Sequence, residues 1–176
     1  VAMSGGWSPV VHLWSHCGGK LIWDEVHSHF RPDAARPPIG ADGAGFVSVA
    51  GIANGAMTTR DCLVSGHDVG AAAAAAAGAK GKAGKAPKGD APDEAAMEPV
   101  WMMPQGASYA LGSKMWLDYQ NDVKVSDVQL AAQEGYESVE HTKRYTTLGM
   151  ATDQGKLSNI NGLAILSDAL GQPIPA

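Results

Sequence analysis

Basic residues and hydroxyls gather in one short segment of this 176-residue chain, residues 144–156. The side chains concerned are those of Arg144, Thr146, Thr147, Thr152 and Lys156. A predicted helix follows the segment, and free N–H groups at a helix start, together with cations and hydroxyls, suit a bound phosphate or carboxylate. The same residues also fit an ordinary capped turn whose Arg144 and Lys156 face solvent, and taken alone they favour that second interpretation.

A second candidate site is a glycine-rich junction in the first half of the chain. The pattern predicts a strand at Gly45–Ala50 that leads through Gly51, Asn54 and Gly55 into a helix over residues 57–77. In doubly wound folds such a junction approaches the phosphates of a dinucleotide, because bare backbone allows close contact and the helix dipole favours anions. Asn54 and Gly55 are therefore candidate dinucleotide contacts. No GxGxxG fingerprint occurs in the sequence, however, and similar junctions also serve only to pack a helix on a sheet.

Potential metal ligands are concentrated in the same half. They are His12, His16, Cys17, His27, His29, Cys62 and His67. His12 and His16 would share a face only in a helix, and the predicted element there is a strand, so we expect no zinc site. Both cysteines are expected to be free thiols. His141 beside Glu140 is the nearest approach to an acid–base pair, and a charged pair on a helix surface explains it better.

The elements that must position these residues follow from local patterns. Helices are predicted over residues 126–133, 139–146 and 157–170, because Ser126 and Ser138 supply capping signals and glycines follow the helices. Strands are predicted at Val10–Trp14, Leu21–Trp23 and Gly45–Ala50. Residues 78–98 are rich in Gly, Ala, Pro and Lys and contain almost no large apolar side chain, which predicts a flexible linker.

Composition excludes several classes of protein. A net charge of −5 and a pI near 5.6 argue against a nucleic-acid surface, which needs a concentrated basic face. No apolar run reaches the roughly 20 residues that cross a bilayer, and the first residues lack the pattern of a signal peptide. We therefore expect a cytoplasmic protein with no membrane contact. The first residue is Val, which leads us to expect a fragment of a larger protein.

One long stretch carries a family resemblance. Residues 140–162 read EHTKRYTTLGMATDQGKLSNING, and the similarity extends over 118–159. The pattern resembles the third (A3) domain in the alpha subunit of heterotetrameric sarcosine oxidase. Related amine dehydrogenases have a small ferredoxin-like module here, with CxC and CxxxxC motifs. The corresponding positions in this chain are Asp118, Gln120, Asp153 and Ser158. None is Cys, so the resemblance implies a descendant without an iron–sulfur cluster.

The resemblance also defines the expected fold, which is α+β. Residues 1–77 are similar to the C-terminal part of the dinucleotide-binding (FAD/NAD-type) domain of the same subunit, so we expect an incomplete Rossmann-like segment. Residues 78–98 are the linker, and residues 99–176 are expected to form a three-helix, ferredoxin-like, cluster-free module. In the wider superfamily the last strand ends in Gly-Asp, and Asn54 stands in that neighbourhood here. We expect the fragment's NAD site to be incomplete.

Function is implied by the same resemblance. The parent enzyme oxidatively demethylates sarcosine to glycine, an oxidation at a CH–NH bond, and forms hydrogen peroxide and methylene-tetrahydrofolate. It carries FAD, NAD and a covalently attached FMN, which lies at the boundary between the alpha and beta subunits. We expect residues 144–156 to contribute FMN contacts and an interface with the beta subunit and the rest of the heterotetramer. The isolated chain should be inactive. The alternative is an autonomous adaptor or regulatory module that has lost its cofactors.

Overall fold

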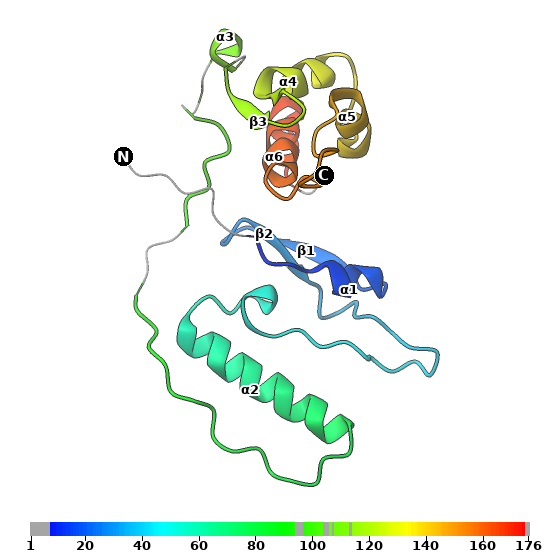
Figure 1. The fold of residues 1–176 in the computed structure, drawn as a ribbon, viewed down its shortest axis with the longest axis vertical. Helices are drawn as coiled ribbons and strands as arrows, with labels where there is room; N and C mark the ends of the chain where they lie inside the picture. Colours follow the sequence, from blue (N-terminus) through cyan, green and yellow to red (C-terminus); the bar gives the residue numbers. More distant parts are fainter. Residues whose placement is uncertain (1–7, 94–96, 104–105, 107, 113, 175–176) are drawn as a thin grey trace. The chain divides into compact units, whose positions relative to one another are not determined.

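The computed structural model describes residues 8–93, 97–103, 106, 108–112 and 114–174 (Figure 1). Contacts divide the chain into two compact units, Gly6–Met97 and a second whose main part is Glu98–Ala176. Within the described residues each unit combines helices with a small two-stranded antiparallel sheet. The predicted α+β class is therefore confirmed.

Among its described residues the C-terminal unit contains four helices and a short hairpin, so the expected three-helix ferredoxin-like module is not confirmed. In chain order its elements are α3 (Tyr109–Gly112), β3 (Trp116–Asp118), β4 (Val123–Lys124), α4 (Val125–Gln133), α5 (Val139–Thr146) and α6 (Asn159–Leu170). The three longer helices lie at or within two residues of the predicted positions. The β3–β4 hairpin was not predicted, because strands of two or three residues are too short to show an alternating pattern.

Its core lies between α4 and α6, beside the hairpin (Figure 1). The buried core side chains are Val123, Val125, Val128, Leu148, Ile165 and Leu166. Fully burying one such side chain contributes about 1.5–3 kcal/mol, so this cluster is the main source of stability in the unit. Helix α4 begins at Val125 because the Lys124 backbone N–H donates to Asp127 Oδ2 at 2.8 Å. The predicted cap at Ser126 is therefore wrong, and Ser126 is buried in the first turn.

The N-terminal unit has a different arrangement. Its elements are α1 (His12–His16), β1 (Leu21–Asp24), β2 (His29–Pro32), the 3-10 helix η1 (Gly51–Asn54) and α2 (Thr59–Ala76). Strands β1 and β2 pair in an antiparallel register that places Leu21 opposite Pro32. Trp14 is buried, and its Nε1 donates to the Lys20 carbonyl at 2.8 Å, which joins α1 to the start of β1.

Two predicted strands in this unit are wrong. Val10–Trp14 was expected to be a strand, but helix α1 begins at His12. Gly45–Ala50 is irregular, with only an isolated bridge between Ile39 and Gly45. No neighbouring strand is available to complete the backbone hydrogen bonds of that segment in the described residues. The Rossmann-like segment, which needs a strand there, is accordingly not confirmed.

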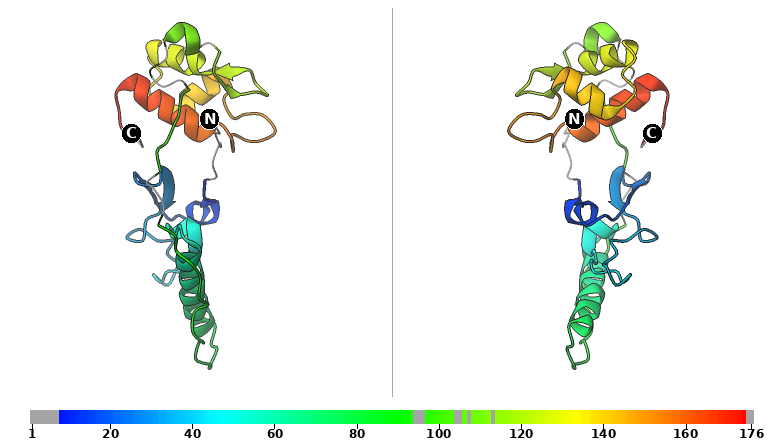
Figure 2. Two further views of the ribbon diagram at one scale, coloured as in Figure 1. Left: turned by 90° about the vertical axis from the view of Figure 1, so that its left-hand side faces the viewer. Right: turned by 90° about the vertical axis from the view of Figure 1, so that its right-hand side faces the viewer.

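Helix α2 is held by its cap and by a returning segment. The Thr58 hydroxyl accepts a hydrogen bond from the Asp61 N–H at 3.1 Å, which fixes the N-terminus. Residues 80–93, here named the strap, have no regular secondary structure and run back along α2 (Figure 2). The Arg60 N–H donates to the Asp90 carbonyl at 3.2 Å, and His67 Nε2 lies 2.7 Å from the Gly84 carbonyl oxygen.

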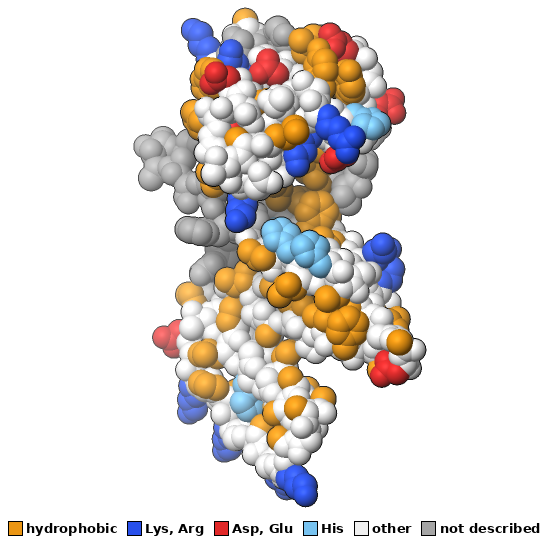
Figure 3. All heavy atoms as spheres, turned by 45° about the vertical axis from the view of Figure 1, so that its right-hand side comes forward, with side chains coloured by type: hydrophobic (Ala, Val, Ile, Leu, Met, Phe, Trp, Pro, Cys, Tyr) orange, Lys and Arg blue, Asp and Glu red, His pale blue; other side chains and the backbone are white. Residues whose placement is uncertain are grey.

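The strap carries much of the basic charge of this unit. Lys80, Lys82, Lys85 and Lys88 all belong to it. Figure 3 shows Lys and Arg side chains around the end of α2 and along this segment.

Within the described ranges, no helix combines the length and the hydropathy that a bilayer-spanning segment requires.

Candidate functional site

The loop between α5 and α6 holds three of the seven predicted site residues, Thr147, Thr152 and Lys156, and two more, Arg144 and Thr146, lie in the last turn of α5. Helix α5 ends at Thr146, and Thr147 adopts the left-handed conformation with φ +63°. Leu148 is then buried in the core at 2% exposure and anchors the start of the loop. The loop reaches α6 at Asn159. The predicted residues 147–156 are thus presented on a segment whose base is fixed by packing.

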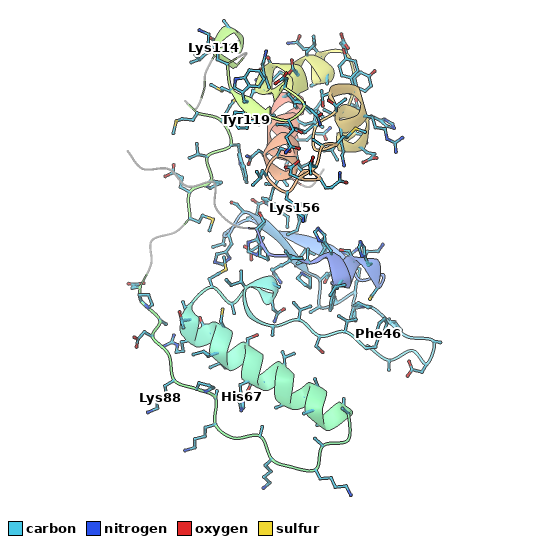
Figure 4. All side chains as sticks on the ribbon, in the orientation of Figure 1. Phe46, His67, Lys88, Lys114, Tyr119 and Lys156 are labelled. Atoms are coloured by element: carbon cyan, nitrogen blue, oxygen red, sulfur yellow. The ribbon has the colours of Figure 1, made fainter. Side chains whose placement is uncertain are left out.

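The two predicted cations differ in their surroundings. Arg144 Nη2 lies 2.9 Å from Glu140 Oε1 one helical turn earlier, and both side chains are exposed. Such surface pairs contribute only about 0.3–0.5 kcal/mol, so little is lost when Arg144 exchanges Glu140 for another anion. Lys156 is exposed, and within the described residues no ion pair engages it (Figure 4). Lys156 is therefore the more available cation.

The three threonines are not equivalent either. Thr146 is used internally, because its Oγ1 donates to the Thr142 carbonyl at 2.8 Å and accepts from the Leu148 N–H at 3.3 Å. Thr147 is exposed, and its Oγ1 lies 2.6 Å from the Thr146 carbonyl oxygen. Thr152 is exposed as well. The structure therefore exposes Thr147 and Thr152 on the same loop as Lys156, while the hydroxyls of Thr146 and Thr147 both donate to backbone carbonyls of α5.

A buried carboxylate that the sequence did not single out as a loop contact organises this loop. Asp118, at the end of β3, is only 4% exposed. Its Oδ1 accepts from the backbone N–H groups of Gln120 and Asn121 at 2.9 and 3.0 Å. Its Oδ2 accepts from the Gly149 N–H at 2.9 Å, across 31 positions of sequence. The carboxylate therefore joins the hairpin turn to the loop.

The charge state of Asp118 follows from these contacts. Burial acts to raise the pKa of its carboxyl, but the hydrogen bonds from Gly149, Asn121 and Gln120 outweigh burial and lower the pKa below the ordinary 3.8. Asp118 is consequently ionised at neutral pH. N–H dipoles balance the negative charge, and no ion pair joins a cation of the described residues to this carboxylate.

Two neighbours of Asp118 make further cross-links to the same loop. Gln120 Oε1 accepts from the Thr152 N–H at 2.8 Å. Asn121 Nδ2 donates to the Thr147 carbonyl at 2.9 Å. Of the four positions that the resemblance led us to compare with cluster cysteines, Asp118 and Gln120 therefore lie on the hairpin and contact the loop. The other two, Asp153 and Ser158, lie in the loop itself, with Ser158 buried.

The predicted dinucleotide contacts lie in the other unit. Asn54 is exposed at the end of η1, and Gly55 follows with φ +85°. The predicted strand–glycine–helix junction is not found, because the chain enters η1 from an irregular segment and α2 begins only at Thr59. Asn54 and Gly55 therefore do not form the expected cradle at a helix N-terminus.

The histidines also differ from the prediction in one respect. Because α1 is a helix, His12 and His16 do share a face, and their ring centroids are 6.3 Å apart. Within the described part of the chain, however, no group of three or more His, Cys, Asp or Glu side chains is arranged to hold a metal ion. Cys17 and Cys62 are free thiols.

Comparison with known proteins gives a consistent result. Residues 112–176 match the model of the sarcosine oxidase A3 domain. The whole chain is 38% identical over 181 residues to the sarcosine oxidase subunit alpha of Corynebacterium sp. (strain P-1), and covers 18% of that protein. It is 35% identical over 172 residues to the sarcosine oxidase subunit alpha of Rhizobium meliloti (strain 1021), with 97% of this chain and 16% of that protein aligned.

A third relative, from Corynebacterium sp. (strain U-96), has the same name and is 38% identical over 183 residues, again covering 18% of its length. The chain thus spans less than a fifth of the length of the curated relatives it matches. The similarity extends through both units, with the A3 domain at the C-terminal end. The chain belongs to the sarcosine oxidase alpha-subunit family.

Proposed function

We propose that this chain is a non-catalytic part of a sarcosine oxidase alpha subunit, and that its C-terminal unit contacts FMN and a partner beta subunit. The parent reaction is then the oxidative demethylation of sarcosine to glycine, with formation of hydrogen peroxide and methylene-tetrahydrofolate. Membership of the alpha-subunit family supports the oxidoreductase context. The substrate, the cofactors and the heterotetramer are part of the proposal.

One observation carries the cofactor-contact role. Lys156 is an exposed cation on a loop that also exposes Thr147 and Thr152, and the base of this loop is fixed by the buried Leu148. An ammonium group and hydroxyls are suitable donors for phosphate oxygens. Bound FMN would supply the redox chemistry, and the residues of this loop would orient its phosphate. Arg144 can join them, since its pair with Glu140 is exposed and weak.

NAD, FAD and tetrahydrofolate are not assigned to the loop between α5 and α6. Asn54 and Gly55 do not fit a dinucleotide phosphate in this structure, because no strand among the described residues leads into them and α2 begins only at Thr59, four residues after Gly55. We derive no role for NAD from these residues. FAD and tetrahydrofolate are assigned to other parts of the assembly, as is the oxidation itself. His141 is exposed, and within the described residues no hydrogen bond joins it to Glu140.

The test is co-expression of the alpha subunit with a sarcosine oxidase beta subunit, followed by size-exclusion chromatography with protein and flavin absorbance read across the complex peak. Lys156→Ala and Arg144→Ala should lower the FMN content or the yield of complex. A lost charged hydrogen bond weakens binding about 10- to 100-fold, and Lys156→Ala should show the larger loss because Lys156 has no competing carboxylate.

Two matched variants make the result specific. Lys156→Arg keeps the charge and should retain FMN. Lys114→Ala removes an exposed lysine elsewhere in the same unit and should leave FMN content unchanged (Figure 4). Normal FMN content and normal assembly in both Lys156→Ala and Arg144→Ala would contradict the proposal. A folded, colourless chain that elutes apart from the beta subunit would favour the adaptor alternative.

A further inference from the structure

Three side chains of one short turn contact the loop between α5 and α6. The turn comprises residues 118–121, between β3 and β4, and is named here the 118–121 turn. Asp118 accepts from the Gly149 N–H at 2.9 Å, Gln120 from the Thr152 N–H at 2.8 Å, and Asn121 donates to the Thr147 carbonyl at 2.9 Å. The contacts are therefore distributed along the whole stretch 147–152. A turn that only closed a hairpin would need none of them.

The stretch that receives these contacts has an unfavourable backbone conformation. Thr147 is β-branched and has φ +63°, a region that such residues rarely adopt. Gly149 follows with φ +67°. Such strained backbone conformations persist only where surrounding contacts hold them in place, and they are often found at ligand contacts. The cross-links from Asn121 and Asp118 act on these two residues themselves.

The central contact depends on charge. The Asp118 carboxylate receives three backbone N–H groups, from Gln120, Asn121 and Gly149, and the Asn121 side-chain amide is 3.4 Å from its Oδ2. Each of these described partners is a donor, so a protonated Asp118 would turn its own O–H group toward donors instead of an acceptor. Hydrogen bonds to an ionised group are roughly twice as strong as neutral ones. The loop is thus attached to the hairpin through a buried negative charge.

We propose that Asp118, Gln120 and Asn121 are positioning residues, which hold the 147–152 backbone in the conformation that presents Thr147, Thr152 and Lys156 to the phosphate group of the flavin. This inference rests on the proposed function. The three residues touch no cofactor themselves. Their effect on flavin is transmitted through the backbone of the loop, with Asp118 as the dominant member because it is buried and charged.

The test uses Asp118→Asn, Gln120→Ala and a matched control, Asp122→Asn. Asp118→Asn has the same shape as Asp118 but turns an N–H group toward N–H donors. Gln120 is exposed, so Gln120→Ala removes one cross-link without disturbing the core. Asp122 belongs to the same hairpin and is exposed, and within the described residues its carboxylate has no hydrogen bond. Asp122→Asn therefore removes the same charge with no effect on the loop.

Two readouts are needed. The first is residue-resolved hydrogen exchange of the Gly149 and Thr152 amides in the chain, with the buried amides of α6 as reference for global unfolding. We expect Gly149 protection to fall at least about tenfold in Asp118→Asn, and Thr152 protection to fall in Gln120→Ala. The second is the FMN content and visible spectrum of the co-expressed complex. If the three residues only stabilised the hairpin, their substitution would leave both FMN content and spectrum unchanged.

The pH profile adds a specific signature. Because the pKa of Asp118 is lowered, its contribution is present above the ordinary pKa of 3.8 and is lost as pH falls through the lowered value. Gly149 protection in the parent chain should decline in that acidic range before the α6 amides exchange. Asp118→Asn should show no such step, and Asp122→Asn should behave like the parent.

The outcomes separate this inference from the proposed function. Unchanged Gly149 protection in Asp118→Asn would overturn the positioning role, whatever happens to FMN. Reduced protection together with altered FMN content or spectrum would support both proposals. Reduced protection with unaltered FMN, while Lys156→Ala still loses FMN, would overturn the positioning role alone. Unaltered FMN in every variant, Lys156→Ala included, would refute the proposed cofactor contact.

Discussion

Gly149→Ala is the sharpest single test of how the α5–α6 loop is packed. Gly149 has φ +67°, and an added Cβ would lie 2.9 Å from the Gly155 Cα and still closer to the Asn159 side chain. The left-handed conformation costs a residue with a side chain about 1–2 kcal/mol. Overpacking against the Gly155 backbone and the Asn159 side chain costs about 1–3 kcal/mol more. The expected loss is therefore about 2–5 kcal/mol in the free energy of unfolding.

Gly171→Ala separates these two costs. Gly171 ends α6 with a similar φ of +64°, but nothing lies within 4 Å of the position its Cβ would take. Gly171→Ala should therefore cost only the conformational part, about 1–2 kcal/mol. The difference between the two variants measures the packing of the loop against Asn159 and Gly155.

The assay is denaturant-dependent hydrogen exchange of the buried α6 amides, which reports unfolding of the C-terminal unit by itself. A double variant, Gly149→Ala with Asn159→Ala, should recover part of the loss, with an interaction energy of about 0.5–3 kcal/mol. Equal costs for Gly149→Ala and Gly171→Ala, or strict additivity in the double variant, would refute the inferred close packing of Gly149 and Asn159.

Three further predictions concern the core of the C-terminal unit, the cap of α2 and the strap. Leu148→Ala should lower the free energy of unfolding of the C-terminal unit by about 2–5 kcal/mol in the same assay, because Leu148 is 2% exposed in the core. Thr58→Ala should destabilise α2 by about 1 kcal/mol through loss of its N-terminal cap, measured by hydrogen exchange in the first turn. The pKa of His67 is raised above 6.5 by hydrogen bonds to the Asp68 carboxylate and the Gly84 carbonyl, since only the imidazolium donates at both nitrogens. The hydrogen bond from His67 to the strap should be fully formed below about pH 6.5 and should weaken as pH rises through the raised pKa. Strap amides should therefore exchange faster above that pKa, after correction for intrinsic exchange rates. His67→Gln should show no such step.

Local signals were sufficient for the helices of the C-terminal unit. Ser138 stands at the N-cap of α5 and the helix has its predicted bounds, although the Ser138 side chain makes no cap hydrogen bond, and Gly171 marks the end of α6. Helix ends depend on the few residues at the terminus, so they can be predicted from a short stretch of sequence. Helix α4 began earlier than predicted, because Asp127 caps the Lys124 backbone through its side chain and Ser126 plays no part in the cap.

The strands could not be predicted in the same way. A short apolar run such as Val10–Trp14 fits a strand or one helical turn equally well, and here Trp14 is the buried residue of helix α1. Gly45–Ala50 has β-forming residues but lacks a neighbour that could complete its hydrogen bonds in the described structure. Strand formation depends on a partner strand that is often distant in sequence, and composition does not identify that partner.

The candidate site illustrates the same limit. Lys156 and the threonines were found from sequence because a cation and hydroxyls beside glycines form a local pattern. Asp118 was noticed only as a position without Cys, although an Asp that starts a polar turn is a known turn signal. Its contact with Gly149 spans 31 positions, and such a contact becomes visible only after the hairpin has been placed beside the loop.

The exposed residues of this site can therefore be recognised from local sequence, while their geometry depends on a buried charge elsewhere in the chain. A substitution at Asp118 should consequently disturb the loop more than loss of any exposed hydroxyl on it, because the carboxylate has three backbone donors and each exposed threonine can be replaced by water.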